Sequence, residues 1–144
     1  MLTDEYFMKQ ALTEARLARE EGEIPIGAVV VCNDRIIARA HNQTERLNDP
    51  TAHAEMLAIT AAVSSLGAKY LTACTLYVTI EPCVMCAGAL NWAQIQTLVY
   101  GAGEEKRGFS RYAPKALHPK TTVRSRILAD ECAREMKEFF KNKR

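Results

Sequence analysis

Two short motifs, well separated along the chain, restrict the folds open to this protein more than any other feature. In the first, Thr51–Glu55, a histidine stands two residues before a glutamate; in the second, Glu81–Cys86, a proline precedes two cysteines. His53, Cys83 and Cys86 are side chains of the kind that bind zinc. A fold that uses all three as ligands must bring these two distant segments to one point.

The number of ligands favours a catalytic zinc ion over a structural one. Three protein ligands leave one position of a tetrahedral ion open, and in catalytic sites this position holds water. Cys83 and Cys86 fall at an expected helix N-terminus, where the helix dipole favours thiolates. Glu55 is two positions after His53, so on a helix the two side chains diverge and the carboxylate is free to reach the water. We therefore expect Glu55 to be the general acid and base.

A structural zinc site would need a fourth ligand from the remaining cysteines and histidines, which are Cys32, His41, Cys74, His118 and Cys132. The cysteines lie in or beside expected strands or on the apolar face of the last helix, where packing explains them better. For the two histidines we expect a solvent-facing or backbone-bonded role. The sequence therefore favours the catalytic site.

The overall composition is that of an ordinary globular protein. The chain has 144 residues, of which 48% are hydrophobic and 25% charged, so we expect one domain over residues 1–144. The N-terminal segment has no signal-peptide pattern, and no apolar run reaches the length of a membrane span. Five cysteines without an export signal argue against disulfides. We predict a cytoplasmic protein that does not contact a membrane.

The charges are unevenly distributed along the chain. Residues 106–126 contain seven Lys or Arg side chains and no acid, whereas residues 1–23 contain six acids and three bases. A basic segment that also carries Phe109 and Tyr112 is typical of a nucleic-acid contact. A solvated loop that is basic by chance is the alternative, and charge alone does not separate the two.

Hydrophobic periodicity and turn residues predict strands that alternate with helices. This alternation predicts the α/β class, with a three-layer α/β/α sandwich whose sheet is covered on both faces. A loop, with room for a short helix, is expected over 102–120. The expected helices span about 7–18, 52–66, 83–92 and 128–140, and the expected strands span 26–31, 35–40, 75–80, 97–100 and 122–127.

At its two motifs the chain resembles the zinc-dependent nucleoside and nucleobase deaminases. Further blocks are similar to bacterial tRNA-specific adenosine deaminases, and the resemblance covers nearly the whole chain. It implies a cytidine deaminase-like fold with a five-stranded mixed sheet. The similar blocks are Glu23–Val29, Asn48–Glu55, Leu76–Thr79, Glu81–Ala89 and Ile127–Cys132.

The resemblance implies hydrolytic deamination of the wobble adenosine of a tRNA anticodon to inosine, with one zinc ion per subunit. It further implies that the partner is the anticodon stem-loop of a tRNA and that the protein is a homodimer. By the same resemblance Asn42 contacts the target nucleotide, although its position after a strand also suits a plain turn residue. The other substrate-binding residues that it implies are Pro25, Ile26, Ala54, Glu81 and Pro82.

Two other functions remain open at this stage. The first is a free nucleobase deaminase, above all a guanine deaminase, which Trp92-Ala93 favours slightly; Ile24–Gly27 and the basic segment speak against it. The second is a non-catalytic RNA-binding module with structural zinc, which has no use for Glu55. Glu104 stands where these tRNA deaminases are expected to have aspartate, so the resemblance is weakest over 103–120.

Overall fold

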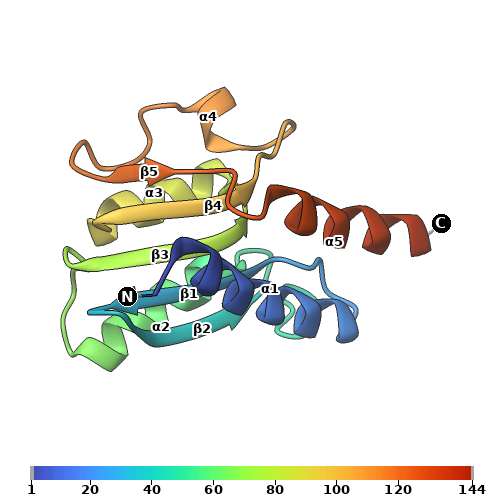
Figure 1. Cartoon of the computed structure of the whole chain (residues 1–144), viewed down its shortest axis with the longest axis horizontal. Helices are drawn as coiled ribbons and strands as arrows, with labels where there is room; N and C mark the ends of the chain where they lie inside the picture. The colour runs from blue at the N-terminus through green and yellow to red at the C-terminus, as the bar shows by residue number, and fades with distance from the viewer. Residues whose placement is uncertain (1, 144) are drawn as a thin grey trace.

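The structure, a computed structural model, describes residues 2–143, and its elements follow the predicted order (Figure 1). Within this part of the chain, no helix combines the length and apolar character needed to cross a membrane. The helices are α1 (Asp4–Glu20), α2 (Ala54–Leu66), α3 (Val84–Ala93), α4 (Phe109–Tyr112) and α5 (Ala129–Asn142). The strands are β1 (Gly27–Cys32), β2 (Arg35–His41), β3 (Cys74–Ile80), β4 (Thr97–Ala102) and β5 (Thr122–Arg124).

The strands form one mixed sheet in the order β2-β1-β3-β4-β5. Strand β1 is antiparallel to both of its neighbours, while β3, β4 and β5 run parallel. The β1–β2 hairpin turns at Asn33 and Asp34, whose φ angles of 54° and 59° are those of the tight turn that matches strand twist. The predicted five-stranded mixed sheet is confirmed.

Helices cover both faces of this sheet, as the alternating pattern predicted. Helices α1 and α5 pack on one face, and α2 and α3 pack on the other (Figure 1). The apolar side of α1 reaches the sheet closely at Gly27, where any Cβ would meet the helix backbone at Ala11. The fold is therefore a three-layer α/β/α sandwich with a core on each side of the sheet.

The segment after β4 differs most from the sequence prediction. The strand predicted over 122–127 ends at Arg124, because Arg126 and Leu128 adopt left-handed backbone conformations with φ of 66° and 54° and turn the chain into α5. The stretch before it is a loop that contains only the short helix α4, as expected. Strand β4 in turn continues beyond its predicted end through Gly101 to Ala102.

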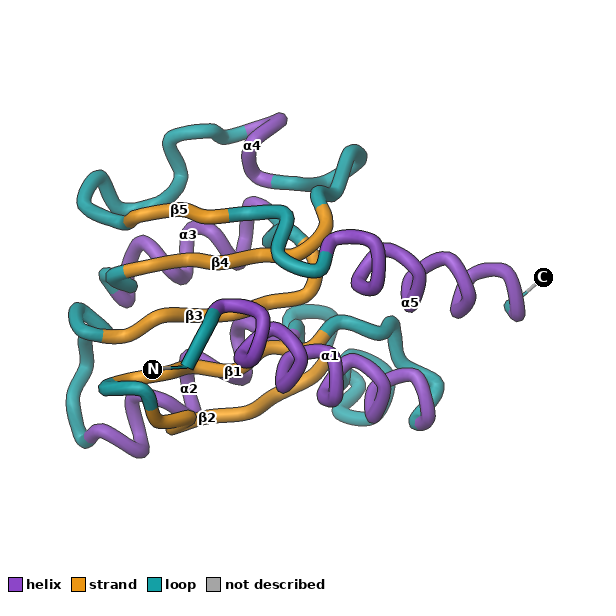
Figure 2. Tube along the Cα trace, viewed as in Figure 1, coloured by secondary structure: helices purple, strands orange, loops and turns teal. Residues whose placement is uncertain are grey.

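One end of the sheet collects the residues singled out by the sequence. Strand β1 begins there, and β2 and β3 end there, because both are antiparallel to β1 (Figure 2). Helices α2 and α3 also begin at this end, directly after His53 and Cys83. In open α/β sheets, ligands bind outside the carboxyl ends of the parallel strands. A ligand-binding site is therefore expected at this end of the sheet.

Candidate metal centre and substrate pocket

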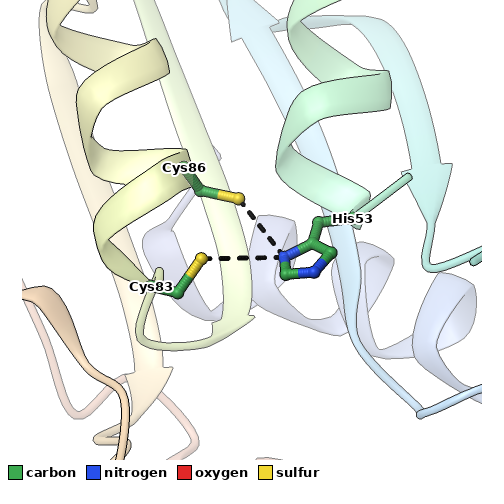
Figure 3. A group of neighbouring side chains, drawn as sticks. All are labelled: His53, Cys83 and Cys86. Atoms are coloured by element: carbon green, nitrogen blue, oxygen red, sulfur yellow. Dashed lines mark hydrogen bonds between the residues drawn. The ribbon is translucent and has the colours of Figure 1, made fainter. Parts of the chain in front are cut away.

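His53, Cys83 and Cys86 meet at the N-termini of α2 and α3 (Figure 3). The Nδ1 atom of His53 lies 3.7 Å from the Cys83 sulfur and 3.5 Å from the Cys86 sulfur. Tetrahedral zinc, with bonds of about 2.0 Å to nitrogen and 2.3 Å to sulfur, requires a nitrogen–sulfur separation of about 3.6 Å. Both nitrogen–sulfur distances therefore match those of a zinc site, and all three ligand atoms lie within 4.8 Å of one another.

The N-termini of two helices position the metal ligands and favour the thiolate form of the cysteines. His53 and Cys83 are the N-cap residues of their helices, with extended backbones (ψ of 153° and 175°), and neither uses its side chain as a cap. The free amides and the dipole at a helix start favour negative charge. A hydrogen bond with the Cys86 thiol, and a second with His53, lower the pKa of Cys83 to about 4. The site thus supplies the thiolate that zinc binding requires.

The other cysteines do not join the metal site. Among residues 2–143, only His53, Cys83 and Cys86 form a group of three or more side chains able to hold a metal ion. Cys74 and Cys132 are buried in the two cores, and burial raises the pKa of each thiol to about 12. Both lie among core side chains, apart from the three converging ligands. The packing role predicted for these two cysteines is confirmed.

The two remaining histidines also lie apart from the metal ligands. The ring of His118 accepts a hydrogen bond from the Lys120 backbone N–H, at 3.1 Å, as expected. The prediction for His41 was wrong, because its two ring nitrogens lie 3.0 Å and 3.1 Å from the carboxylates of Glu14 and Glu21. Burial lowers the pKa of His41, but these hydrogen bonds outweigh burial and raise it.

Glu55 lies in the first turn of α2 and is only 3% exposed. His53, Cys83 and Cys86 all influence the pKa of its carboxyl group, so this group lies beside the metal ligands. Burial raises the pKa of Glu55 to about 7. A carboxyl group near neutrality can both accept and release a proton, so the arrangement suits acid–base chemistry.

A cavity of about 440 Å³ opens beside this group and is lined by both His53 and Glu55. Of the residues that the resemblance implied as substrate contacts, Ile26, Asn42 and Ala54 line it. Most of the other lining residues were not predicted from the sequence. The polar, turn-forming residues of 42–50 could have indicated a loop beside the site. These further lining residues are Ile24, Thr44, Glu45, Asn48, Asp49 and Pro50.

Asn42 has an unusual environment within this cavity. Its backbone N–H donates to the Ile26 carbonyl at 3.1 Å, which fixes the residue just beyond the end of β2. The side chain is 4% exposed, and its Oδ1 has no hydrogen-bond partner within residues 2–143. A buried acceptor left without a donor is costly and uncommon. The amide oxygen is therefore suited to a donor on a bound ligand.

The other three implied contacts lie outside the cavity wall. Pro25 is buried and does not line the cavity. The Glu81 carboxylate accepts hydrogen bonds from the Glu104 N–H at 3.1 Å and from the N–H and hydroxyl of Ser110 at 3.0 Å and 2.6 Å. The Pro82 carbonyl accepts from the N–H of residue 109 at 2.9 Å. Glu81 and Pro82 thus connect the basic segment, residues 106–126, to the residues next to the metal ligand Cys83.

Comparisons with known proteins agree with this geometry. The model of the cytidine and deoxycytidylate deaminase zinc-binding region matches residues 1–102. The tRNA-specific adenosine deaminase of Bacillus subtilis is 44% identical, over 100% of this chain and 92% of its own length. A solved tRNA:A34 deaminase, studied for A-to-I editing at the wobble position of transfer RNA, is 44% identical with a TM-score of 0.84, over 90% of this chain and 98% of that one.

A guanine deaminase is also similar, over a smaller share of both chains. The X-ray structure of guanine deaminase from Bacillus subtilis is 44% identical with a TM-score of 0.68, over 71% of this chain and 66% of that one. Three findings together identify the family of this chain: the matched zinc-binding region, the near full-length relatives and the three converging ligands. It belongs to the cytidine and deoxycytidylate deaminase family of zinc-binding proteins, and within that family to the tRNA-specific adenosine deaminases.

Proposed function

We infer that this protein hydrolyses adenosine to inosine at the wobble position of a tRNA anticodon. The observation that carries the inference is the convergence of His53, Cys83 and Cys86 beside a cavity that Glu55 also lines. The near full-length match to tRNA-specific adenosine deaminases supports the choice of substrate over other amino-bearing bases.

The chain's own residues divide the chemistry between them. Zinc, when bound by His53, Cys83 and Cys86, acts as a Lewis acid that makes water a nucleophile at neutral pH. Glu55 accepts a proton as the water attacks carbon 6 of the adenine. It then donates a proton to the departing amine, which leaves as ammonia. Within residues 2–143, Glu55 is not part of the group of side chains that can hold the metal ion, which supports its role as a proton carrier rather than a ligand.

In this proposal the base is held by one polar group and by two apolar residues of the cavity wall. The unpartnered Oδ1 of Asn42 accepts a hydrogen bond from the target nucleotide. Ile26 and Ala54 line the same cavity and supply apolar surface against which the base packs. An adenosine inside a helix cannot reach this depth, so the substrate is a nucleotide extruded from a loop.

The basic segment supplies the RNA contacts. Two of its seven cations are used within the protein, since Arg124 pairs with Asp4 at 2.8 Å and Arg111 donates to the Glu105 carbonyl at 3.2 Å. The remaining basic side chains of this segment are exposed and make no hydrogen bond or ion pair within residues 2–143, which supports a role in binding phosphates. They are Lys106, Arg107, Lys115, Lys120 and Arg126.

A second copy of the chain covers the outer face of α3, which makes the protein a homodimer. Trp92 on this face is 84% exposed, and Val84 and Met85 are exposed beside it. Tyr70 and Trp92 line a hollow of about 360 Å³ there. Exposed Trp and Met side chains are typical of interface cores. We expect Trp92→Asp to convert the dimer to a monomer in light scattering; a wild-type monomer, or an unchanged dimer in the variant, would contradict this surface.

The substrate assignment is tested by comparing rates on an anticodon stem-loop RNA, free adenosine and free guanine. We expect the RNA alone to be converted, at a rate that falls as salt rises because phosphate contacts release counterions. Guanine turnover without RNA turnover would reverse the assignment in favour of the guanine deaminase, whose structure is also similar.

A further inference from the structure

Residues 43–50, which we call the wall loop, form one side of the cavity through Thr44, Glu45 and Asn48–Pro50. The loop is a compact turn, closed by hydrogen bonds from the Leu47 N–H to the Gln43 carbonyl at 2.9 Å and from the Asp49 N–H to the Thr44 carbonyl at 3.0 Å. Like the first turn of a helix, such a turn leaves its leading amides without a partner inside the turn.

Glu23 binds these leading amides from outside the loop. Its Oε1 accepts from the Glu45 N–H at 3.0 Å, and its Oε2 accepts from the Arg46 N–H at 2.8 Å. The side chain is 1% exposed, and the Glu23 backbone is held in turn by a hydrogen bond to the Ala18 carbonyl at 2.9 Å. The end of α1 is thus connected through one buried carboxylate to the cavity wall.

Two further acids of the same region hold the neighbouring residues. Glu21 lies 3.1 Å from His41 and 3.7 Å from the Arg46 guanidinium, and Glu14 binds the other ring nitrogen of His41 at 3.0 Å. His41 directly precedes Asn42, the polar contact of the cavity. Three acids from α1 and the residues directly after it therefore hold the segment 41–46, which accounts for part of the acid excess in residues 1–23.

We propose that Glu23 is a positioning residue that sets the wall loop for the RNA nucleotide and so determines substrate affinity rather than the chemical step. The proposal rests on the proposed function, because it takes the cavity as the nucleotide site. The metal ligands and Glu55 stand on α2 and α3 or at their N-caps, outside the wall loop. Loosening the loop should therefore weaken binding while the catalytic groups keep their places.

The variant that tests this is Glu23→Gln, measured as the zinc-loaded enzyme. Glutamine keeps the size of the side chain but turns one acceptor into an NH₂ group that faces a backbone N–H, so one of the two tethers is lost. Loss of a hydrogen bond to a charged group corresponds to about a tenfold change in affinity. We expect KM for the stem-loop RNA to rise about tenfold and kcat to stay within about twofold.

Two further measurements separate positioning from a general loss of stability. Amide hydrogen exchange should accelerate at residues 45 and 46 in Glu23→Gln, and this readout needs no RNA. The matched control is Glu135→Gln, since Glu135 is also buried but anchors α5 to α1 through Arg16 and Arg19, at 3.3 Å and 2.9 Å. The control should lower thermal stability and leave both KM and loop exchange unchanged.

Each outcome decides a different point. Unchanged KM in a folded Glu23→Gln enzyme, or an equal rise in the control, would overturn the positioning role. If Glu23→Gln does not fold, Glu21→Gln replaces it, because Glu21 is more exposed and holds the same segment through Arg46 and His41; KM must then rise in that variant. A wild-type enzyme without activity on RNA would instead overturn the proposed function. Faster amide hydrogen exchange at residues 45 and 46 in Glu23→Gln would even then show that Glu23 holds the wall loop.

Discussion

Replacement of Glu55 by glutamine probes the chemistry most sharply, because it removes the proton carrier and little else. The side chain is 3% exposed and sits beside Cys86, so an isosteric amide fits the same space. An amide cannot relay the proton from the attacking water to the leaving amine. Proton transfer by a positioned side chain contributes about 10²- to 10⁴-fold to a rate, and Glu55 serves two such transfers. We expect kcat to fall by about 10³-fold or more.

The assay pairs turnover with metal content. Inosine formation in the stem-loop RNA is followed under single-turnover conditions, and zinc per chain is measured by elemental analysis. We expect Glu55→Gln to keep one zinc ion, because all three ligands remain, and to bind the RNA with nearly unchanged affinity. Glu135→Gln again serves as the buried-glutamate control and should keep full activity. Retention of kcat within tenfold of wild type, or loss of zinc from Glu55→Gln, would refute the assignment.

Two other predictions concern the supports of the site. Because the pKa of His41 is raised in the folded state, its pairing with Glu14 and Glu21 stabilises the fold below the ordinary pKa of about 6.5 and is lost as pH rises through the raised value. In urea unfolding, the free energy of unfolding of His41→Gln should therefore fall furthest below that of wild type near pH 6, and the two values should converge at alkaline pH. A difference in unfolding free energy that widens as pH rises would contradict this. In Gly108→Ala the new Cβ would clash with the Glu81 carboxylate and the Glu104 carbonyl oxygen and so displace the basic segment; KM for the RNA should therefore rise while zinc is retained. Gly103→Ala is the control, because its new Cβ makes only an ordinary contact, and it should match wild type in KM.

The sequence was most informative where chemistry dictates residue type and spacing. His53, Cys83 and Cys86 were identified before the fold was known, because few arrangements other than a zinc site combine these side chains with a proline and a helix start. The sheet and its covering helices followed from local periodicity. The end of β5 was missed because left-handed residues such as Arg126 and Leu128 carry no strong sequence signal when they are not glycine.

The supports of the site were harder to predict, because they depend on contacts between distant segments. Glu23 appeared only as part of a matching block, and its hydrogen bonds to the wall loop, 22 and 23 residues further along, require the tertiary fold. The substrate contact expected of Glu81 stays a prediction, but the hydrogen bonds that its carboxylate accepts from the backbone of Glu104 and Ser110 could not be foreseen without the tertiary fold. His41 was misjudged for the same reason, since its partners lie on α1 and at its C-cap.

Product analysis of a single stem-loop pair tests the central claim most directly. One RNA carries adenosine at the wobble position, and a matched RNA carries guanosine there with every other adenosine retained. With the zinc-loaded enzyme we predict inosine only at the wobble position of the first RNA, one ammonia released per inosine, and no change in the second. Deamination of both RNAs alike, or of neither while free guanine is consumed, would contradict the account.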